Sequence, residues 1–469
     1  MTASLLTLGE PNMTAFREGL AAQQAGRVAA AIDAYRRALR RHPGLAPAHF
    51  NLGQLLREQG DYRGAAACFE GAARLRPNAT DAWLNLGAML ERLDRHSDAV
   101  AAYERAAACG SDDPTPHYNR GNALLALGDF EGAAAAFRTV VEAQPDHADA
   151  QWNLATALLA AGRFSKGWEH YEWRWAKQRL DPSARFGWPL WRGEPVAGKR
   201  ILVWREQGLG DELLFATCLR ELVAGGAEVT LMASPRLVSL FERAFPSIAV
   251  VADGKLKHGT FDWHVPIGGL PRHLRRSRNE FPSTTKFLVP DSSHATRWSN
   301  RLDKMGAGPK IGICWRSGLL AEDRRRHFSA LSEWGPLLAT PDVHWINLQY
   351  DNCGPELTQA EKAFGVTIHR WKSENLKDDL ESVVGLLWNL DAVVTAPTAV
   401  SSLAGGVGVP TWEVDSGGDW TAHGEDRSPW FPTIQVIRRQ RGSTDWAPAL
   451  GRVAAELQRT FSGGGALVR

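Results

Sequence analysis

Hydrophobic positions in the first third of the chain recur with helical spacing, as in AHFNLGQLLREQG (48–60). In such segments the apolar residues fall three or four positions apart, which is typical of an amphipathic helix. A glycine ends that helix, and a second segment with the same periodicity, DYRGAAACFEGAARL (61–75), follows directly. The pattern predicts pairs of short helices joined by tight turns.

These helix pairs repeat every 34 residues, and four columns of residues stay in register from one unit to the next. The aromatic column is Tyr35, Phe69, Tyr103, Phe137 and Tyr171, and the small-residue column is Gly19, Gly53, Gly87, Gly121 and Ala155. The turn column is Gly26, Gly60, Asp94, Gly128 and Gly162, and the closing column is Pro43, Pro77, Ser111 and Pro145. One helix pair cannot bury its apolar face alone, so we expect the units to stack into an α-solenoid. The units resemble tetratricopeptide repeats, about five of them, over residues 12–175.

A fifth column consists of asparagines that packing does not explain: Asn51, Asn85, Asn119 and Asn153. Each lies on the first helix of its unit, although asparagine is a mediocre helix former. In tetratricopeptide arrays that helix lines the concave face, and the column resembles the asparagine ladder that holds polypeptide in protein O-GlcNAc transferases. The resemblance implies a groove that binds a protein acceptor. The alternatives are that each amide satisfies a neighbouring backbone group, or is a relic of repeat duplication.

The stretch after the repeats, residues 168–191, contains five tryptophans. Pro182 and Pro189 prevent a helix from continuing through it. We expect a rigid apolar joint that ends the array and docks it on the next domain, with residues 176–198 as the linker. A stacking platform for sugar rings is the alternative.

From Lys199 the hydrophobic pattern changes to short buried runs with helical segments between them. Residues 199–308 contain RILVW (200–204), EVTLMA (228–233), IAVVAD (248–253) and WHVPI (263–267). Residues 309–445 contain KIGICW (310–315), VHWINLQY (343–350), VTIHRW (366–371), DAVVTAP (391–397) and PTWEV (410–414). This alternation predicts two Rossmann-like α/β domains, with a ligand cleft at the carboxyl ends of their parallel strands. A C-terminal helix and tail, 446–469, follow. The predicted fold class is thus α + α/β.

Five segments of these halves resemble, in order, those of bacterial glycosyltransferases of the GT-B fold. They are EQGLGDELLF (206–215), IGICWRSG (311–318), NLQYD (347–351), VVTAPTAVSSLAGGVGVPTW (393–412) and DRSPWFP (426–432). The likeness covers about residues 165–460 and is to the heptosyltransferase-like superfamily, in its branch fused to tetratricopeptide repeats, which includes flagellin-modifying members. It implies a metal-independent enzyme that moves a sugar from a nucleotide sugar to a Ser or Thr hydroxyl of a protein. No further cofactor is implied, and the flagellin-modifying members make flagellin a candidate acceptor.

Asp211 matches the aspartate of the family's Gly-Leu-Gly-Asp motif, which implies a base that takes a proton from the acceptor hydroxyl. Gly208 and Gly210 would then permit close approach of the backbone to the substrate. Aspartate is also among the best helix-capping residues, so a simple cap is the alternative. The positive end of a helix lowers the basicity of a carboxylate, whereas burial in a closed cleft raises it.

The second half supplies the donor-binding residues that the resemblance implies. Arg316 and Ser317 end a strand at the expected cleft and are candidates for phosphate or sugar contacts. Gln349 and Tyr350 end the next strand, beside the nucleotide. Arg326 matches a basic residue of the family, and its guanidinium can neutralise charge on a departing phosphate. Its neighbours Arg324 and Arg325 are typical of a solvated loop.

The segment APTAVSSLAGGVG (396–408) begins a helix directly after a buried strand. Its free N–H groups form an anion site to which Thr398 and Ser401 add hydroxyls. The segment also departs from the family, because many members carry Asp in place of Pro397 and His in place of Ser402. Either this branch uses a different donor, of which a nonulosonic acid on CMP is one example, or catalysis is impaired.

Composition and charge exclude several other classes. A net charge of +2 over 469 residues gives no electrostatic case for a nucleic-acid or membrane partner. The sequence has no 18-residue apolar run and no signal-peptide pattern at its start, and its five cysteines lack metal-ligand spacing. We therefore expect a cytoplasmic protein with reduced thiols and no metal site. The basic run 272–278 can steer an anionic ligand, but it is also typical of a surface loop.

Two other functions remain open on this sequence. One is a heptosyltransferase-like enzyme that acts on lipopolysaccharide or another glycan, with the repeats serving assembly only. The other is a non-catalytic repeat scaffold that carries a degenerate transferase domain.

Overall fold

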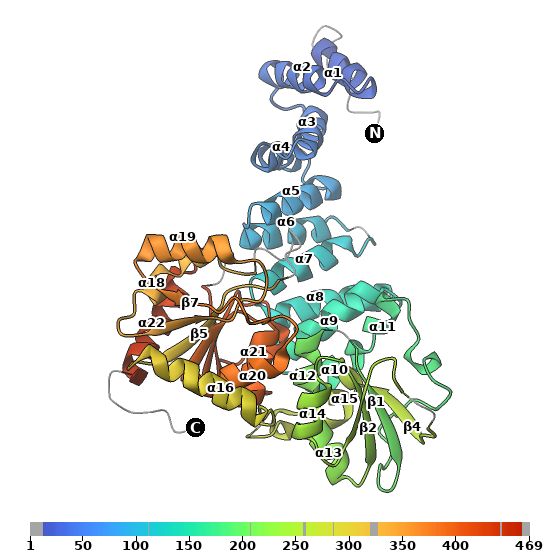
Figure 1. Cartoon of the computed structure of the whole chain (residues 1–469). Coiled ribbons are helices and arrows are strands. Elements are labelled where there is room, and N and C mark those ends of the chain that lie inside the picture. Colours follow the sequence, from blue (N-terminus) through green and yellow to red (C-terminus); the bar gives the residue numbers. More distant parts are fainter. Residues whose placement is uncertain are drawn as a thin grey trace. The chain divides into compact units, whose positions relative to one another are not determined.

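The computed structural model describes residues 13–110, 112–206, 208–256, 259–284, 286–318, 327–440 and 443–461. The chain divides into two compact units, Met1–Leu154 and Ala155–Arg469. Each unit is described by itself, with the element labels of Figure 1. The domain limits 12–175, 176–198, 199–308, 309–445 and 446–469 stay predictions.

The first unit is a stack of helix pairs, as the sequence pattern predicts (Figure 1). The pairs are α1 (Thr14–Gln24) with α2 (Val28–Arg41), α3 (Ala46–Glu58) with α4 (Tyr62–Leu75), α5 (Thr80–Arg92) with α6 (His96–Ala108), and α7 (Thr115–Ala126) with α8 (Phe130–Ala143). The next pair is α9 (Ala148–Ala160) with α10 (Phe164–Tyr171), and α9 spans the boundary between the two units.

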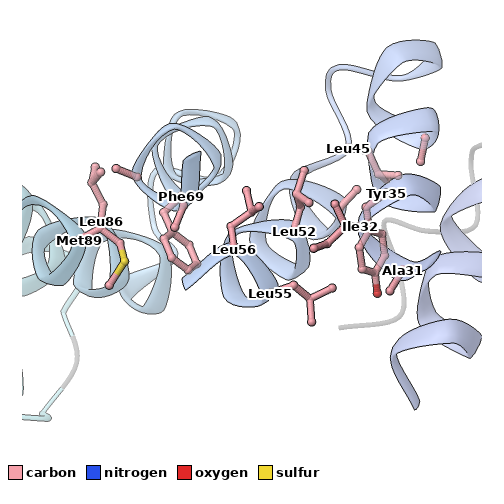
Figure 2. Close-up of a cluster of buried hydrophobic side chains, with 14 of the residues drawn as sticks. Ala31, Ile32, Tyr35, Leu45, Leu52, Leu55, Leu56, Phe69, Leu86 and Met89 are labelled. Atoms are coloured by element: carbon pink, nitrogen blue, oxygen red, sulfur yellow. The ribbon is translucent and has the colours of Figure 1, made fainter. Parts of the chain in front are cut away.

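The small and aromatic columns pack against each other. A methyl group on Gly87 would lie 2.4 Å from the ring of Tyr103, and one on Gly121 would lie 2.6 Å from the ring of Phe137. The residues of the small column have to be small because the aromatic ring of the second helix packs directly on the backbone of the first helix. Figure 2 shows how buried side chains of successive pairs, among them Tyr35 and Phe69, contribute to one apolar core.

The turn column is explained by backbone conformation. Gly60 and Gly128 have φ of 79° and 68°, in the left-handed region that glycine adopts without a steric penalty. Asp94, which replaces glycine in its unit, adopts the same conformation with φ of 56°. The turn geometry is therefore constant along the array although the residue is not.

The proline column has a hydrogen-bonding role as well as a helix-ending one. In three units the proline carbonyl lies within 2.7–2.9 Å of a side-chain nitrogen six residues later: Pro43 with His49, Pro77 with Trp83, and Pro145 with Gln151. A carbonyl in each loop is thereby satisfied from the helix that follows. Ser111 lies outside the described residues.

The second unit contains two parallel sheets, which confirms the predicted α/β class. The four-stranded sheet has the order β3-β2-β1-β4, from β1 (Arg200–Trp204), β2 (Glu228–Ala233), β3 (Ala249–Ala252) and β4 (Trp263–Pro266). The six-stranded sheet has the order β10-β9-β8-β5-β6-β7. Its strands are β5 (Lys310–Cys314), β6 (His344–Asn347), β7 (Ile368–His369), β8 (Ala392–Thr395), β9 (Thr411–Asp415) and β10 (Ile434–Arg438). The hydrophobic pattern of the sequence does not indicate β10, an edge strand in which polar Gln435 and Arg438 flank the short apolar run.

Helices lie on the sheets of this unit (Figure 1). They include α13 (Leu219–Ala224), α14 (Val238–Ala244), α15 (Pro271–Leu274), α16 (Ser292–Leu302), α18 (Gly335–Leu338), α19 (Gly354–Phe364), α20 (Leu380–Asn389) and α22 (Ala447–Phe461). Two others start just after a strand ends: α12 (Leu209–Ala216) after β1, and α21 (Ala399–Val407) after β8. Because α12 and α21 pack on each other, the carboxyl-end edges of the two sheets meet at their N-termini.

The tryptophan-rich segment packs on both halves of this unit. Trp168 is 1% exposed, lies against Phe215 and Trp430, and donates a hydrogen bond of 2.8 Å to the carbonyl of Arg275. His423 approaches the carbonyl of Leu159 at 2.9 Å. A ring as buried as that of Trp168 cannot offer a face to a sugar. Trp168 therefore packs as an apolar joint would require, and the role of the whole segment stays a prediction.

Candidate functional site

A cavity of about 610 Å³ opens where the starts of α12 and α21 meet, and we call it the main cavity. Its size is in the range of ligand-binding pockets. Residues from both α/β halves line it: Gly208, Leu209, Gly210, Asp211 and Arg236 from the first, and Ser317, Tyr350, Lys377, Pro397, Thr398, Ser401, Ser402, Glu413, Asp419 and Trp420 among those from the second. The cleft expected from the fold class thus exists as a defined hollow.

Asp211 lies in the wall of the main cavity and also closes the start of α12. Its Oδ2 accepts the backbone N–H of Gly208 at 3.3 Å, which is the contact of a helix-capping carboxylate. The side chain is half-buried. The geometry therefore accommodates both the cap and the base, and the role of Asp211 in catalysis stays a prediction.

The two glycines of this turn are not required by their protein neighbours. A methyl group on Gly210 would lie 3.5 Å from Ser402 Oγ, and one on Gly208 would lie 3.7 Å from Asp211 Oδ2. These are ordinary van der Waals distances, so a side chain of one carbon would fit. A role of the two glycines in letting the backbone approach a substrate stays a prediction.

The start of α21 has the features of an anion site. Thr398 is its N-cap, with Oγ1 accepting the N–H of Val400 at 3.3 Å. The first-turn N–H groups carry the positive end of the helix dipole. Thr398 and Ser401 both line the main cavity, together with Pro397 and Ser402 where the resemblance departs. The structure thus brings these four residues together.

Glu413 is a cavity residue that the sequence reasoning missed. It is 7% exposed on β9 and accepts a hydrogen bond from the hydroxyl of Ser401. Burial, with a further contribution from Asp419, raises the pKa of Glu413 well above its usual range. The available signal was the carboxyl group inside the apolar run PTWEV. Burial of an acidic side chain costs free energy unless it is paired, so its place in a buried strand indicates a polar contact or a site.

Of the four predicted donor contacts that follow β5 and β6, two line the main cavity and two do not. Ser317 and Tyr350 line it, and the hydroxyl of Tyr350 accepts the N–H of Gly318 at 3.1 Å. Arg316 is 7% exposed and bonds Asp351 and Glu356.

Gln349, which is 2% exposed, donates to the carbonyl of Arg316 at 3.0 Å and also bonds Asp351. Neither Arg316 nor Gln349 is among the residues that line the main cavity. Together they hold the ends of β5 and β6, and a contact of either residue with the donor stays a prediction.

A second, smaller cavity of about 260 Å³ adjoins the main one. Tyr350 and Leu376 line both. Its other lining residues include Gln349, Asp351, Trp371 and Asn375. The two hollows therefore meet at Tyr350.

Cationic residues at the main cavity come from places the sequence did not indicate. Arg236 and Lys377 line it, and Arg236 donates to the carbonyl of Lys377 at 2.9 Å. They are isolated in sequence, so no motif marks them. The predicted cation Arg326, with Arg324 and Arg325, lies outside the described residues.

The asparagine column is largely engaged within the array. Asn51 donates to the Tyr35 hydroxyl at 3.2 Å, and Asn85 donates to the Asp81 carbonyl at 2.8 Å. Asn153 donates to Asn122 and Tyr118 at 2.9 and 3.3 Å. Asn119 alone makes no side-chain hydrogen bond to another described residue. These contacts match the alternative in which the amides serve their neighbours, and peptide binding stays a prediction.

Two features are absent from the part of the chain that the structure describes. No group of three or more His, Cys, Asp and Glu side chains in this part of the chain could hold a metal ion. Over the same residues, no helix combines the length and apolarity needed to cross a bilayer.

Comparison with known proteins agrees with the repeat architecture. Residues 16–62, 50–114 and 118–172 match the family model of the tetratricopeptide repeat. Protein FlbA of Caulobacter vibrioides is 36% identical over 315 residues, which are 63% of this chain and 52% of FlbA. This chain therefore spans about half the length of that relative. The chain thus has an N-terminal tetratricopeptide-repeat array followed by two parallel α/β sheets.

Solved structures resemble about a third of the chain. MamA from Desulfovibrio magneticus RS-1 is 19% identical with a TM-score of 0.33, covering 37% of this chain and 99% of its own. YrrB, described as a TPR protein with an unusual peptide-binding site, is 24% identical with a TM-score of 0.32, covering 34% of this chain and 83% of its own. A tetratricopeptide repeat protein from Parabacteroides merdae is 16% identical with a TM-score of 0.33, covering 37% and 69% respectively. These likenesses are too weak to support a functional conclusion.

Proposed function

We propose that this protein is a glycosyltransferase of the GT-B type that moves a sugar from a nucleotide sugar to a Ser or Thr hydroxyl of a protein. The observation that carries the proposal is the main cavity, which residues of both α/β halves line. It combines a carboxylate, Asp211, with the N-terminus of α21. Those are the two features that glycosyl transfer from a phosphate-linked donor needs, a base and an anion site.

The donor is assigned to the half that contains α21. Its phosphates bind at the positive, N-terminal end of α21, with the hydroxyls of Thr398 and Ser317 beside them. Arg236 and Lys377 add positive charge in the same wall. The nucleoside extends past Tyr350 into the second cavity, which is large enough for a ring system and contains polar side chains.

The acceptor hydroxyl is assigned to the side of Asp211. The carboxylate takes the hydroxyl proton, and the oxygen then forms a bond to the anomeric carbon of the sugar. The bond between that carbon and the phosphate oxygen breaks, and its electron pair leaves with the nucleotide. The positive end of α21 stabilises the charge that develops on that phosphate.

The repeat array is assigned to the recruitment of the protein acceptor. Stacked tetratricopeptide repeats are a protein-binding architecture, and their fusion to a transferase-like unit favours a polypeptide substrate. Flagellin is the candidate that the sequence resemblance supplies.

Intact-mass spectrometry of candidate acceptors tests the proposal, with flagellin first. Proteins are compared from cells with the gene, without it, and with the gene restored. A protein that loses a defined mass only when the gene is absent supports the proposal, and the mass identifies the sugar. Unchanged masses of all soluble proteins, together with an altered lipopolysaccharide, would contradict it.

The second candidate is transfer to lipopolysaccharide or another glycan, with the repeats serving assembly. Three of the four asparagine amides already bond within the array, which favours a repeat face that is not reserved for a peptide. Mass analysis of the glycan fraction in the same experiment separates this candidate from the first.

A further inference from the structure

A buried arginine outside the main cavity is bonded to the segment that leads into α12. Arg174, on the short helix α11 (Arg174–Lys177), has a side chain that is 2% exposed. Its Nε donates to Oε2 of Glu206 at 2.8 Å, and its Nη2 donates to Oε1 of the same carboxylate at 3.0 Å. This is the two-point geometry that makes an arginine–carboxylate pair directional.

Glu206 also forms a hydrogen bond with a second backbone segment. Its Oε1 also accepts the N–H of Gly268 at 2.8 Å. Glu206 follows β1 by two residues and precedes Asp211 by five, so it belongs to the connection that ends in the candidate base. The pair therefore ties α11, the β1–α12 connection and the turn after β4 at one buried point.

The surroundings of Arg174 explain why the charge is retained. The guanidinium lies 4.6 Å from the ring centre of Tyr171 and 4.7 Å from that of Trp175, and Nη1 donates to Glu172 at 2.7 Å. Burial by itself lowers the pKa of Arg174, but the paired carboxylates raise it above the ordinary value. A planar, permanently charged fork suits this site, and the compact ammonium of lysine cannot reproduce it.

We propose that Arg174 is a positioning residue for the candidate catalytic carboxylate. Through Glu206 it fixes the backbone from which α12 and Asp211 project into the main cavity. Its effect on turnover rests on the proposed function, whereas its effect on the backbone does not. This residue of the tryptophan-rich joint would therefore be part of the machinery of the second unit, although it touches no substrate.

The test is amide hydrogen exchange on the full-length protein, resolved by peptide, for wild type, Arg174→Lys and Glu206→Gln. Exchange in peptides that cover 205–215 should accelerate at least tenfold in both variants, while peptides of β2 stay as in wild type. Arg301→Lys is the control, because Arg301 also pairs with a buried carboxylate, that of Glu374 at 2.6 Å, but lies on α16. It should leave the 205–215 peptides unchanged. Unchanged exchange in both test variants, or a uniform acceleration throughout the unit, would overturn the proposal.

Gly268→Ala gives an independent perturbation that leaves Arg174 intact. The added methyl group would lie 2.6 Å from Oε1 of Glu206 and must displace that carboxylate. Exchange in the 205–215 peptides of this variant should accelerate as it does in Arg174→Lys. Exchange at the wild-type rate would contradict a positioning role for the Glu206 contact.

Once an acceptor is known, Arg174→Lys should lower kcat at least tenfold and leave the KM for the donor unchanged. A raised KM with unchanged kcat would contradict positioning of the base. If wild type transfers no sugar, the proposed function fails, and the exchange data still decide the contact.

Discussion

Replacement of Asp211 by asparagine separates the two roles that its geometry allows. The carboxylate accepts the backbone N–H of Gly208 at 3.3 Å. Asparagine keeps an oxygen that can accept this hydrogen bond, so the cap survives in part. What is lost is the negative charge at the positive end of α12, a contribution of about 0.3–1 kcal/mol.

The catalytic cost should be far larger than this structural cost. Removal of a general base lowers a rate typically by about 10²–10⁴. Asp211→Asn should therefore unfold within about 1 kcal/mol of wild type and lose nearly all transfer. The assay compares thermal unfolding of the purified variant with the fraction of acceptor modified, by intact mass, in cells that lack the gene and carry each variant at equal protein level.

Asp291→Asn is the matched control. Asp291 caps α16 by accepting the N–H of Ser293 at 2.9 Å, and it is not among the residues that line the main cavity. The control should show a similar small change in stability with full transfer. The reasoning is refuted if Asp211→Asn retains more than half of wild-type transfer, because Asp211 would then be a cap only.

Three further outcomes follow from packing and titration. Burial raises the pKa of Glu413 from 4.5 to about 8, so its proton binds the folded state more tightly. The stability that protonated Glu413 contributes is complete below about pH 4.5 and is lost as pH rises to about 8. Between pH 5 and 8, the thermal midpoint of Glu413→Gln should therefore fall less than that of wild type. Gly87→Ala should destabilise the repeats by about 1–2 kcal/mol, because the methyl group would lie 2.4 Å from the Tyr103 ring and overpacking outweighs helix propensity. Gly44→Ala, with no atom within 4 Å of the added group, should be neutral in the same chemical denaturation, and equal effects would contradict the packing argument. Asn119→Ala should weaken co-purification of the acceptor without altering stability; unchanged co-purification would leave the column without a binding role.

The repeats could be predicted because their information is local. The conformation at Asp94 follows from its place in a column of glycines, and the ring of Tyr103 covers Gly87 because both recur at a fixed spacing. Site residues are less predictable, because a strand end can point to the cavity or into the fold. Ser317 lines the main cavity, whereas its neighbour Arg316 is held by Asp351 and Glu356.

The sequence by itself determined the helix pairs, their period, the parallel character of the second unit and the segments that begin α12 and α21. Hydrophobic periodicity and turn residues act over a few positions, so the amino-acid sequence is enough to specify these elements. Only the tertiary structure decided which polar groups meet. It placed Glu413 beside Ser401, Arg236 in the cavity wall, and Arg174 on Glu206, thirty-two residues away in the chain. Such contacts depend on how separate elements pack and on burial, which strengthens the electrostatic attraction between paired charges. The local sequence pattern specifies neither the packing nor the burial.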